Sequence, residues 1–303
     1  NVTAVLEFKL LGFSSNPCCQ IMLFIVGLVI YILTILGNII IILVVTLEPQ
    51  LHSPMFKFLQ NLSFLEICYI NTIIPKMLST LVAKRKSISF SGCLAQLYSF
   101  VSLGATECYL LAAMAYDRFL AVCQPLHYGV LMTEEFCVRL AGGSWLTGVL
   151  TGFLPCLMVS RLHFCNCNLI DHFFCDISPL LKLSCSDTTV TEAVIFILSL
   201  LVLASCFLLT LLSYFLIILT ILKTPSASGK RVTFSTCSSH LMVVTIYYGT
   251  MIFMYVRPTY SLSSELNKAV SVLYTVVTPL LNPVIYSLRN KAFKKALKKT
   301  VFR

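Results

Sequence analysis

The chain has 303 residues, of which 58% are hydrophobic and 11% are charged, and its mean hydropathy is +0.90. Soluble domains carry about 25% charged residues, so this composition is that of an integral membrane protein. The net charge of +10 is dispersed along a membrane chain, and we expect no nucleic-acid partner.

Seven apolar stretches are long enough to cross a membrane, since a helical span needs about 20 apolar residues. The loops between them are short and no internal repeat is visible, which predicts a single seven-helix domain over residues 1–303. The first 20 residues lack the features of a signal peptide, so we expect the first span to act as its own insertion signal. The predicted spans are Ile21 to Val45, Met55 to Leu81, Cys93 to Val122, Val138 to Val159, Glu192 to Leu222, Val232 to Val256 and Ala269 to Leu288.

The two ends of the chain are expected on opposite sides of the membrane because the number of spans is odd. Residues 289–303 form a basic tail, which favours the cytoplasm and contact with anionic lipid. Residues 1–20 are then extracellular, and Asn1 opens a sequon that we expect to be glycosylated. A second sequon at Asn61 would lie in the membrane and stay unmodified. With this orientation, more of the basic residues lie on the cytoplasmic side than outside. The main exception is the run Lys84 to Lys86 in the first outer loop.

The outer loops carry an odd number of cysteines, in or beside oxidising surroundings. The loop over residues 160–191 is long, and two disulfides would fold it into a lid over the bundle, although the sequence alone leaves the pairing open. The loop also has soft metal ligands close together, but a disulfide sulfur is no thiolate ligand, and we expect no metal. The outer cysteines are Cys93, Cys165, Cys167, Cys175 and Cys185, and the other loop ligands considered are His172 and Asp176.

Asp117 and Arg118 form a charged pair at the end of the third span, where an arginine is costly to keep. A switch that releases Arg118 to a partner explains the pair, and an ion pair that anchors the helix end is the alternative. The seventh span is also interrupted, by the helix breaker Pro283 and the polar side chains of Asn282 and Tyr286. Lys230 and Arg231 precede the sixth span, so Arg118 has no acidic partner there and Asp117 must hold it.

Several motifs in order carry a resemblance over nearly the whole chain. It resembles the vertebrate odorant receptors, a branch of the rhodopsin-like G protein-coupled receptors, and Tyr247-Tyr248-Gly249 in the sixth span is typical of that branch. The resemblance implies disulfides Cys93–Cys175 and Cys165–Cys185, with Cys167 left over. The motifs are Gly37-Asn38, Leu51 to Phe56, Pro75 to Leu78, Met114 to Cys123 with Pro125 to Tyr128, His172 to Asp176, Phe234 to Leu241, Pro279 to Pro283 and Tyr286 to Asn290.

The resemblance also implies a coupling switch and a polar cluster inside the membrane. The switch residues are Asp117, Arg118, Tyr214, Lys230, Arg231, His240, Asn282, Pro283 and Tyr286. Glu66 and Glu107 lie near the middle of spans, with Asn38 and Asn282 as expected neighbours. Two carboxylates at low dielectric cannot both ionise cheaply, so they share a proton, bind a cation, or form a hydrogen-bonded structural cluster.

A ligand pocket is expected in the outer half of the bundle. One stripe on the third span follows helical spacing, and the resemblance places residues of spans five, six and seven opposite it. Arg257 and Lys268 lie higher and are expected to be solvated. The predicted pocket residues are Phe100, Val101, Gly104, Ala105, Cys108, Leu198, Val202, Met251, Ile252, Tyr255, Ser271 and Thr275.

The predicted function is that of an odorant receptor, a multi-pass protein of the plasma membrane. Apolar walls with a few hydroxyls suit a small, mostly apolar organic ligand, and Phe100 offers an ammonium group no counter-ion. The resemblance implies activation of a stimulatory, olfactory-type G protein that raises cyclic AMP, with no cofactor. A transporter or channel is the alternative, disfavoured by the missing repeats, and no nucleophile and base pair indicates an enzyme.

Overall fold

The computed structural model describes residues 5–13, 16–83, 86–165, 168–223, 227–255 and 264–301. Within these ranges, side chains are described except at 227–236, 239, 253–255, 264, 286–289, 291 and 301. Asn1, Lys84, Arg85, Cys167 and Arg257 therefore lie outside the described residues.

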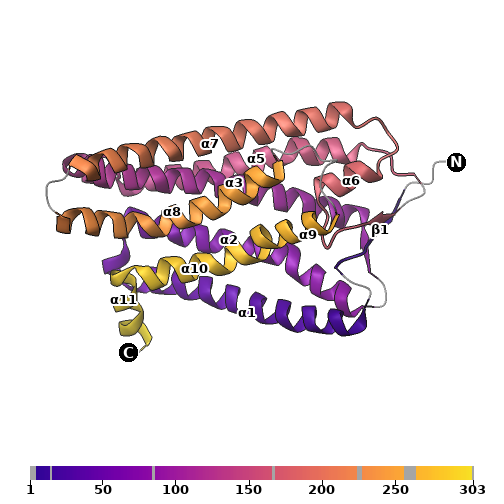
Figure 1. Ribbon diagram of the computed structural model, residues 1–303, viewed down its shortest axis with the longest axis horizontal. Coiled ribbons are helices and arrows are strands. Elements are labelled where there is room, and N and C mark those ends of the chain that lie inside the picture. Colours follow the sequence, from indigo (N-terminus) through magenta and orange to yellow (C-terminus); the bar gives the residue numbers. More distant parts are fainter. Residues whose placement is uncertain are drawn as a thin grey trace.

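Long helices run side by side along the length of the molecule, with the amino terminus at one end and the carboxyl terminus at the other (Figure 1). Among the described residues, six helical segments are long and apolar enough to cross a membrane, and a shorter apolar stretch, His240–Ile252, lies in α8. The seven-helix fold predicted from the sequence is confirmed. The segments are α1 (Pro17–Leu47), α2 (Pro54–Val82), α3 (Phe90–Cys123), α5 (Glu134–Ser160), α7 (Thr189–Lys223), α8 (Ala227–Tyr255) and the seventh helix, made of α9 (Ser264–Val272), η2 (Leu273–Val277) and α10 (Thr278–Arg289).

Most helices extend a few residues beyond both ends of the apolar stretch that predicted them, because capping residues lie outside that stretch, whereas α8 is described only to Tyr255 of the predicted Val232 to Val256. Ser89 accepts a hydrogen bond from the Gly92 backbone at the start of α3, and Thr133 accepts one from Phe136 at the start of α5. The seventh helix contains a π-helical turn, η2, a form often found at functional positions in helices.

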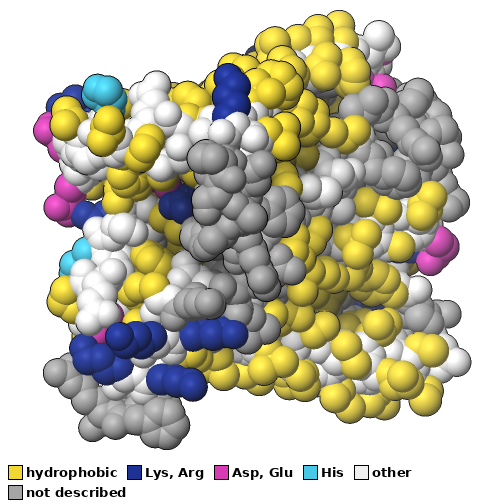
Figure 2. All heavy atoms as spheres, turned by 60° about the vertical axis from the view of Figure 1, so that its left-hand side comes forward, with side chains coloured by type: hydrophobic (Ala, Val, Ile, Leu, Met, Phe, Trp, Pro, Cys, Tyr) yellow, Lys and Arg dark blue, Asp and Glu magenta, His cyan; other side chains and the backbone are white. Residues whose placement is uncertain are grey.

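Short elements close the two ends of the bundle. At the inner end are η1 (Pro49–Leu51), α4 (Pro125–Leu131) and α11 (Lys291–Val301). In Figure 1, α11 turns away from the long axis of the bundle, and in Figure 2 basic side chains gather at this end while apolar side chains cover the flank. The basic residues of α11 include Lys294, Lys295, Lys298 and Lys299, and Lys299 binds the buried carboxylate of Glu48 at 2.8 Å.

At the outer end, three strands that the sequence did not predict form a small sheet in the order β2-β1-β3. The strands are β1 (Glu7–Leu10), β2 (Ser87–Ser89) and β3 (Leu169–Ile170). β1 pairs antiparallel to β2, with Glu7 opposite Ser89, and parallel to β3, with Lys9 opposite Leu169. The sheet therefore ties the amino-terminal segment to the first and second outer loops, and Phe8 and Leu10 pack in a core beneath it.

Close helix contacts at two places depend on glycine. A Cβ atom on Gly148 or Gly152 of α5 would lie 2.0 Å from Oγ1 of Thr106 or 2.1 Å from Oγ of Ser102 on α3. A Cβ atom on Gly37 of α1 would lie 3.2 Å from Pro283 of α10. Small residues let membrane helices approach in this way, so α5 lies against α3 and the first helix lies against the seventh.

Candidate ligand cavity, lid and inner switch

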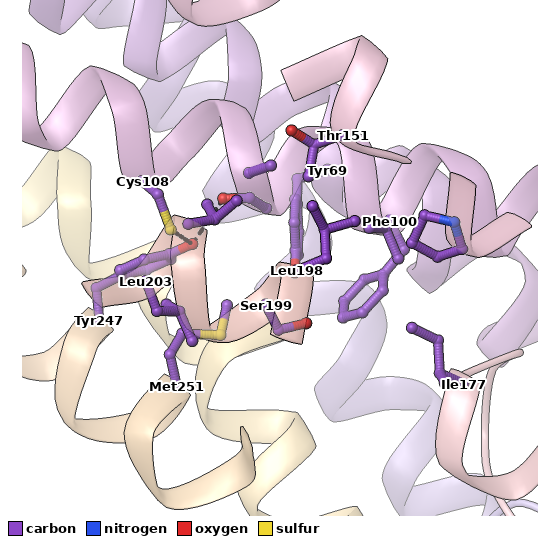
Figure 3. A pocket seen from close by; sticks show the side chains of 15 residues that line it. Tyr69, Phe100, Cys108, Thr151, Ile177, Leu198, Ser199, Leu203, Tyr247 and Met251 are labelled. Carbon is purple, nitrogen blue, oxygen red and sulfur yellow. Dashed lines mark hydrogen bonds between the residues drawn. The ribbon is translucent and has the colours of Figure 1, made fainter. Parts of the chain in front are cut away.

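A cavity lies in the outer half of the bundle between α3, α5, α7 and α8, with about 560 Å³ of space free of protein atoms, its open mouth included. Figure 3 shows the side chains around it. The lining residues belong to six helices. None of the described residues that line the wall carries a charge. The lining residues are Tyr69, Phe100, Val101, Gly104, Ala105, Cys108, Thr151, Pro155, Ile177, Leu198, Ser199, Val202, Leu203, Tyr247 and Met251.

Eight of the predicted pocket residues lie on this wall: Phe100, Val101, Gly104, Ala105, Cys108, Leu198, Val202 and Met251. The stripe on α3 forms one continuous face because its members recur at helical spacing. Whether these residues contact a ligand stays a prediction.

Four predicted pocket residues do not line the cavity or cannot be placed. Ile252 is 38% exposed and points away from the bundle, since it lies one position, or about 100°, beyond Met251 on the helix. Ser271 and Thr275 are buried, but their hydroxyls have other partners. Oγ1 of Thr275 donates to the Ser271 carbonyl at 2.7 Å, and Oγ of Ser271 lies 3.3 Å from Nε2 of His172. The side chain of Tyr255 lies outside the described residues.

Sequence reasoning missed the contributions of α2, α5 and the short helix α6 (Ile177–Leu183) to the wall. Thr151 and Pro155 face the cavity because the glycines at 148 and 152 press the adjacent face of α5 against α3. The spacing of these glycines was the one signal in the sequence that could have pointed to α5.

Tyr247 is the main polar group at the base of the cavity. Its hydroxyl donates to the Gly104 carbonyl at 2.7 Å and lies 3.2 Å from Sγ of Cys108 (Figure 3). This hydrogen bond links α8 to α3 directly beneath the cavity. A ligand that displaces Tyr247 or Met251 would therefore change the contact between the two helices.

The described part of the second outer loop packs as a lid against the outer end of the cavity. The structure contains the disulfides Cys93–Cys175 and Cys165–Cys185. Phe174 is fully buried, and its ring centroid lies 5.0 Å from that of Phe100 at the outer edge of the cavity. The two disulfides consume four of the five outer cysteines.

No group of His, Cys, Asp or Glu side chains suited to a metal is present in the described part of the chain. His172 and Asp176 instead make hydrogen bonds that hold the lid in place. Burial, together with the nearby Lys268 ammonium, lowers the pKa of His172 to about 3, and burial raises the pKa of Asp176 to about 6. The Asp176 carboxylate caps α6 by accepting from the Ile177 backbone at 2.8 Å.

Lys268 differs from the expectation of a solvated side chain. It is 4% exposed and binds the carboxylates of Asp171 at 2.7 Å and Glu265 at 3.3 Å. The sequence could not show this, because Asp171 lies 97 residues away in the loop that folds over α9. The pair joins the lid to the seventh helix.

The predicted polar cluster lies at the centre of the bundle. Asn282 donates a short hydrogen bond to Oε1 of Glu66, and both residues are buried. Asn38 donates to the carbonyls of Thr34 at 3.0 Å and Pro279 at 3.4 Å. Glu107 is buried within electrostatic range of Glu66. Among the described side chains, Oε2 of Glu66 and Oε1 of Glu107 have no hydrogen-bond partner, so the two carboxyls have capacity for a proton or a cation.

At the inner end, Arg118 is held by its neighbour in the chain. Its Nη2 lies 2.6 Å and its Nε 3.1 Å from Oδ2 of the fully buried Asp117. The hydroxyl of Tyr128 on α4 donates to the other carboxylate oxygen at 2.7 Å, a contact that sequence reasoning missed. Burial and the adjacent Asp117 raise the pKa of Tyr128, which therefore keeps its proton.

A second contact at the inner end joins the fifth and sixth spans. The hydroxyl of Tyr214 lies 2.6 Å from Nδ1 of His240, and both side chains are buried. These are two of the predicted switch residues, and the structure brings them together. The side chains of Lys230, Arg231 and Tyr286 lie outside the described residues, so the lack of an acidic partner for Arg118 at the inner end of α8 stays a prediction.

Comparisons with known proteins agree with this arrangement. The family model described as olfactory receptor matches residues 28–303. The chain is 59% identical over its whole length to olfactory receptor 11L1 of Homo sapiens, covering 94% of that protein, and 50% identical to human olfactory receptor 6N1, covering 97%. It is 48% identical to olfactory receptor 6B9 of Mus musculus, with 99% of this chain and 95% of that protein aligned. With a lidded apolar cavity at one end of seven helices and a held arginine at the other, the chain belongs to the olfactory receptor family.

Proposed function

We propose that this protein binds small, neutral, mostly apolar organic odorants in the cavity and responds by activating a stimulatory, olfactory-type G protein that raises cyclic AMP. The observation that supports this most is the apolar character of the cavity wall, whose described lining residues carry no charge. A charged ligand would lose its hydration there without gaining a partner.

The helix α3 connects the cavity to the charged pair at the inner end of the bundle. It carries Gly104 and Cys108 at the cavity and Asp117 and Arg118 at the inner end, a rigid link of about 1.5 Å per residue. A ligand that shifts the contact between Tyr247 and α3 would bias the packing of α8, and with it the exposure of Arg118. The switch requires differential ligand affinity for the two arrangements.

The remaining assignments follow from this function. We infer one receptor domain over residues 1–303, with an extracellular segment at 1–20, a stapled lid at 160–191 and a basic tail at 289–303 that contacts anionic lipid. Asn1 is the proposed glycosylation site. Asn38, Glu66, Glu107 and Asn282 are inferred to tune the equilibrium of the switch.

A nucleotide-exchange assay on purified receptor tests the proposal. Odorants found by screening a chemically diverse panel should accelerate exchange on a stimulatory G protein, with an inhibitory-type G protein as the matched control. Equal acceleration of both would refute the coupling assignment. Ligand-dependent solute flux into vesicles without exchange would establish the transporter or channel alternative.

A further inference from the structure

The cavity wall is covered unevenly. Its residues on α2, the base of α3 and α8 are almost fully buried, with Tyr69 and Tyr247 each 1% exposed. Thr151 on α5 and Leu198, Ser199 and Leu203 on α7 are only half-buried. Apart from Val101, the partly exposed section of the wall is therefore the section between α5 and α7.

The packing of α3 explains this opening. α3 packs extensively against both α5 and α7, whereas α5 and α7 touch each other sparsely. The glycines at 148 and 152 let α5 pack directly on the backbone of α3. The two helices are held by a common neighbour and leave the outer-half cavity open between them.

The surface beside the opening is apolar and faces the hydrocarbon of the membrane. Phe153 on α5 and Leu201 on α7 are 61% and 63% exposed, and their neighbours Leu154 and Leu200 are also exposed. An apolar ligand gains about 0.8 kcal/mol for each CH₂ that leaves water, so it concentrates in the bilayer. The molecules that suit the cavity are thus most abundant next to this opening.

The path from water is covered by the described part of the lid. Ile177 lines the cavity from above, and Phe174 packs on Phe100. The disulfide Cys93–Cys175 attaches this loop to α3, and the pair Lys268–Asp171 attaches it to α9. A ligand arriving from water through these residues would have to displace the buried lid.

We propose that ligands reach the cavity sideways, from the outer leaflet of the bilayer, through the opening between α5 and α7 past Thr151 and Ser199. The inference rests on the proposed ligand site. Because the opening is a passage, narrowing it slows binding and release together and leaves the equilibrium affinity nearly unchanged.

The test measures both rates in lipid nanodiscs with the neutral apolar fluorophore N-phenyl-1-naphthylamine. Energy transfer from Trp145, the one tryptophan of the chain and a residue of α5, reports occupancy. Gly104→Phe sets the background from probe dissolved in lipid, because a side chain there has open space in the cavity. Ser199→Phe narrows the opening from α7 and Thr151→Phe narrows it from α5, so that either variant suffices if the other fails to fold.

In Ser199→Phe or Thr151→Phe, the association and dissociation rates should both fall about tenfold, with Kd changed less than about threefold. Leu208→Phe, which adds the same bulk at an exposed position of α7 away from the cavity, should keep parent rates. Lys268→Met, which removes the ion pair between the lid and α9, should keep them as well. Unchanged rates in both narrowed variants, or faster rates in Lys268→Met, would overturn the route. A probe signal in Gly104→Phe equal to the parent would overturn the cavity as the ligand site, and the route with it.

Discussion

Replacing Tyr128 with phenylalanine should raise the basal activity of the receptor. The change deletes the hydroxyl that donates to Asp117 Oδ1 at 2.7 Å while keeping the ring. Asp117 is fully buried, so its Oδ1 would lose a partner that water cannot easily replace. Among the described side chains, Arg118 alone would then bind the Asp117 carboxylate, and the closed arrangement would become less stable.

The size of the effect follows from the chemistry of the bond. A hydrogen bond to a charged group contributes about 1.5–3 kcal/mol, and the half-buried position of Tyr128 favours the lower end. A loss of about 1.4 kcal/mol from the closed state multiplies the active fraction about tenfold while that fraction is small. A receptor that is about 1% active without ligand would therefore become about 10% active.

A cyclic AMP reporter without odorant, normalised to surface level by antibody staining, measures this change. Tyr98→Phe is the matched control, because it removes a tyrosine hydroxyl that donates to the Val149 carbonyl at 3.3 Å in the outer half, far from Arg118. Basal activity equal to or below the parent in Tyr128→Phe, at equal surface level, would show that Tyr128 does not stabilise the closed arrangement.

Four further predictions concern the switch, the lid, the cavity and the helix packing. Arg118→Ala should abolish odorant-stimulated exchange with surface expression near normal, and unchanged signalling would contradict the switch. Cys93→Ser or Cys175→Ser should fail to mature, since losing such a bridge costs about 2–5 kcal/mol, whereas the exposed Cys18→Ser should mature normally in a glycosylation and surface assay. Gly104→Leu should lower the potency of larger odorants more than that of smaller ones in a dose series, because the new side chain occupies cavity space; an equal loss for all sizes would argue for misfolding. Gly152→Ala should lower thermal stability by about 1–3 kcal/mol through overpacking, because its Cβ would meet Ser102 at 2.1 Å, while Gly142→Ala has open space and should be neutral.

The sequence by itself determined the class of fold. Runs of about 20 apolar residues must form helices in a membrane, because the lipid offers no partner for backbone N–H and C=O groups. The local spacing of Phe100, Gly104 and Cys108 likewise placed them on one face of a helix, and adjacency in the chain predicted the pair of Asp117 and Arg118. These inferences needed only contacts within a helix. The disulfide pairing came from the family resemblance, since spacing alone allows several pairings.

Only the tertiary structure decided which faces of different helices meet. The close contact of α5 with α3 through Gly148 and Gly152 turned Thr151 and Pro155 toward the cavity, while Ser271 and Thr275 bond within the seventh helix and the lid. Lys268 is buried because a loop distant in sequence brings Asp171 to it. The rotation of a helix about its axis and the path of a loop depend on packing between distant segments, and no periodicity within one segment records that packing.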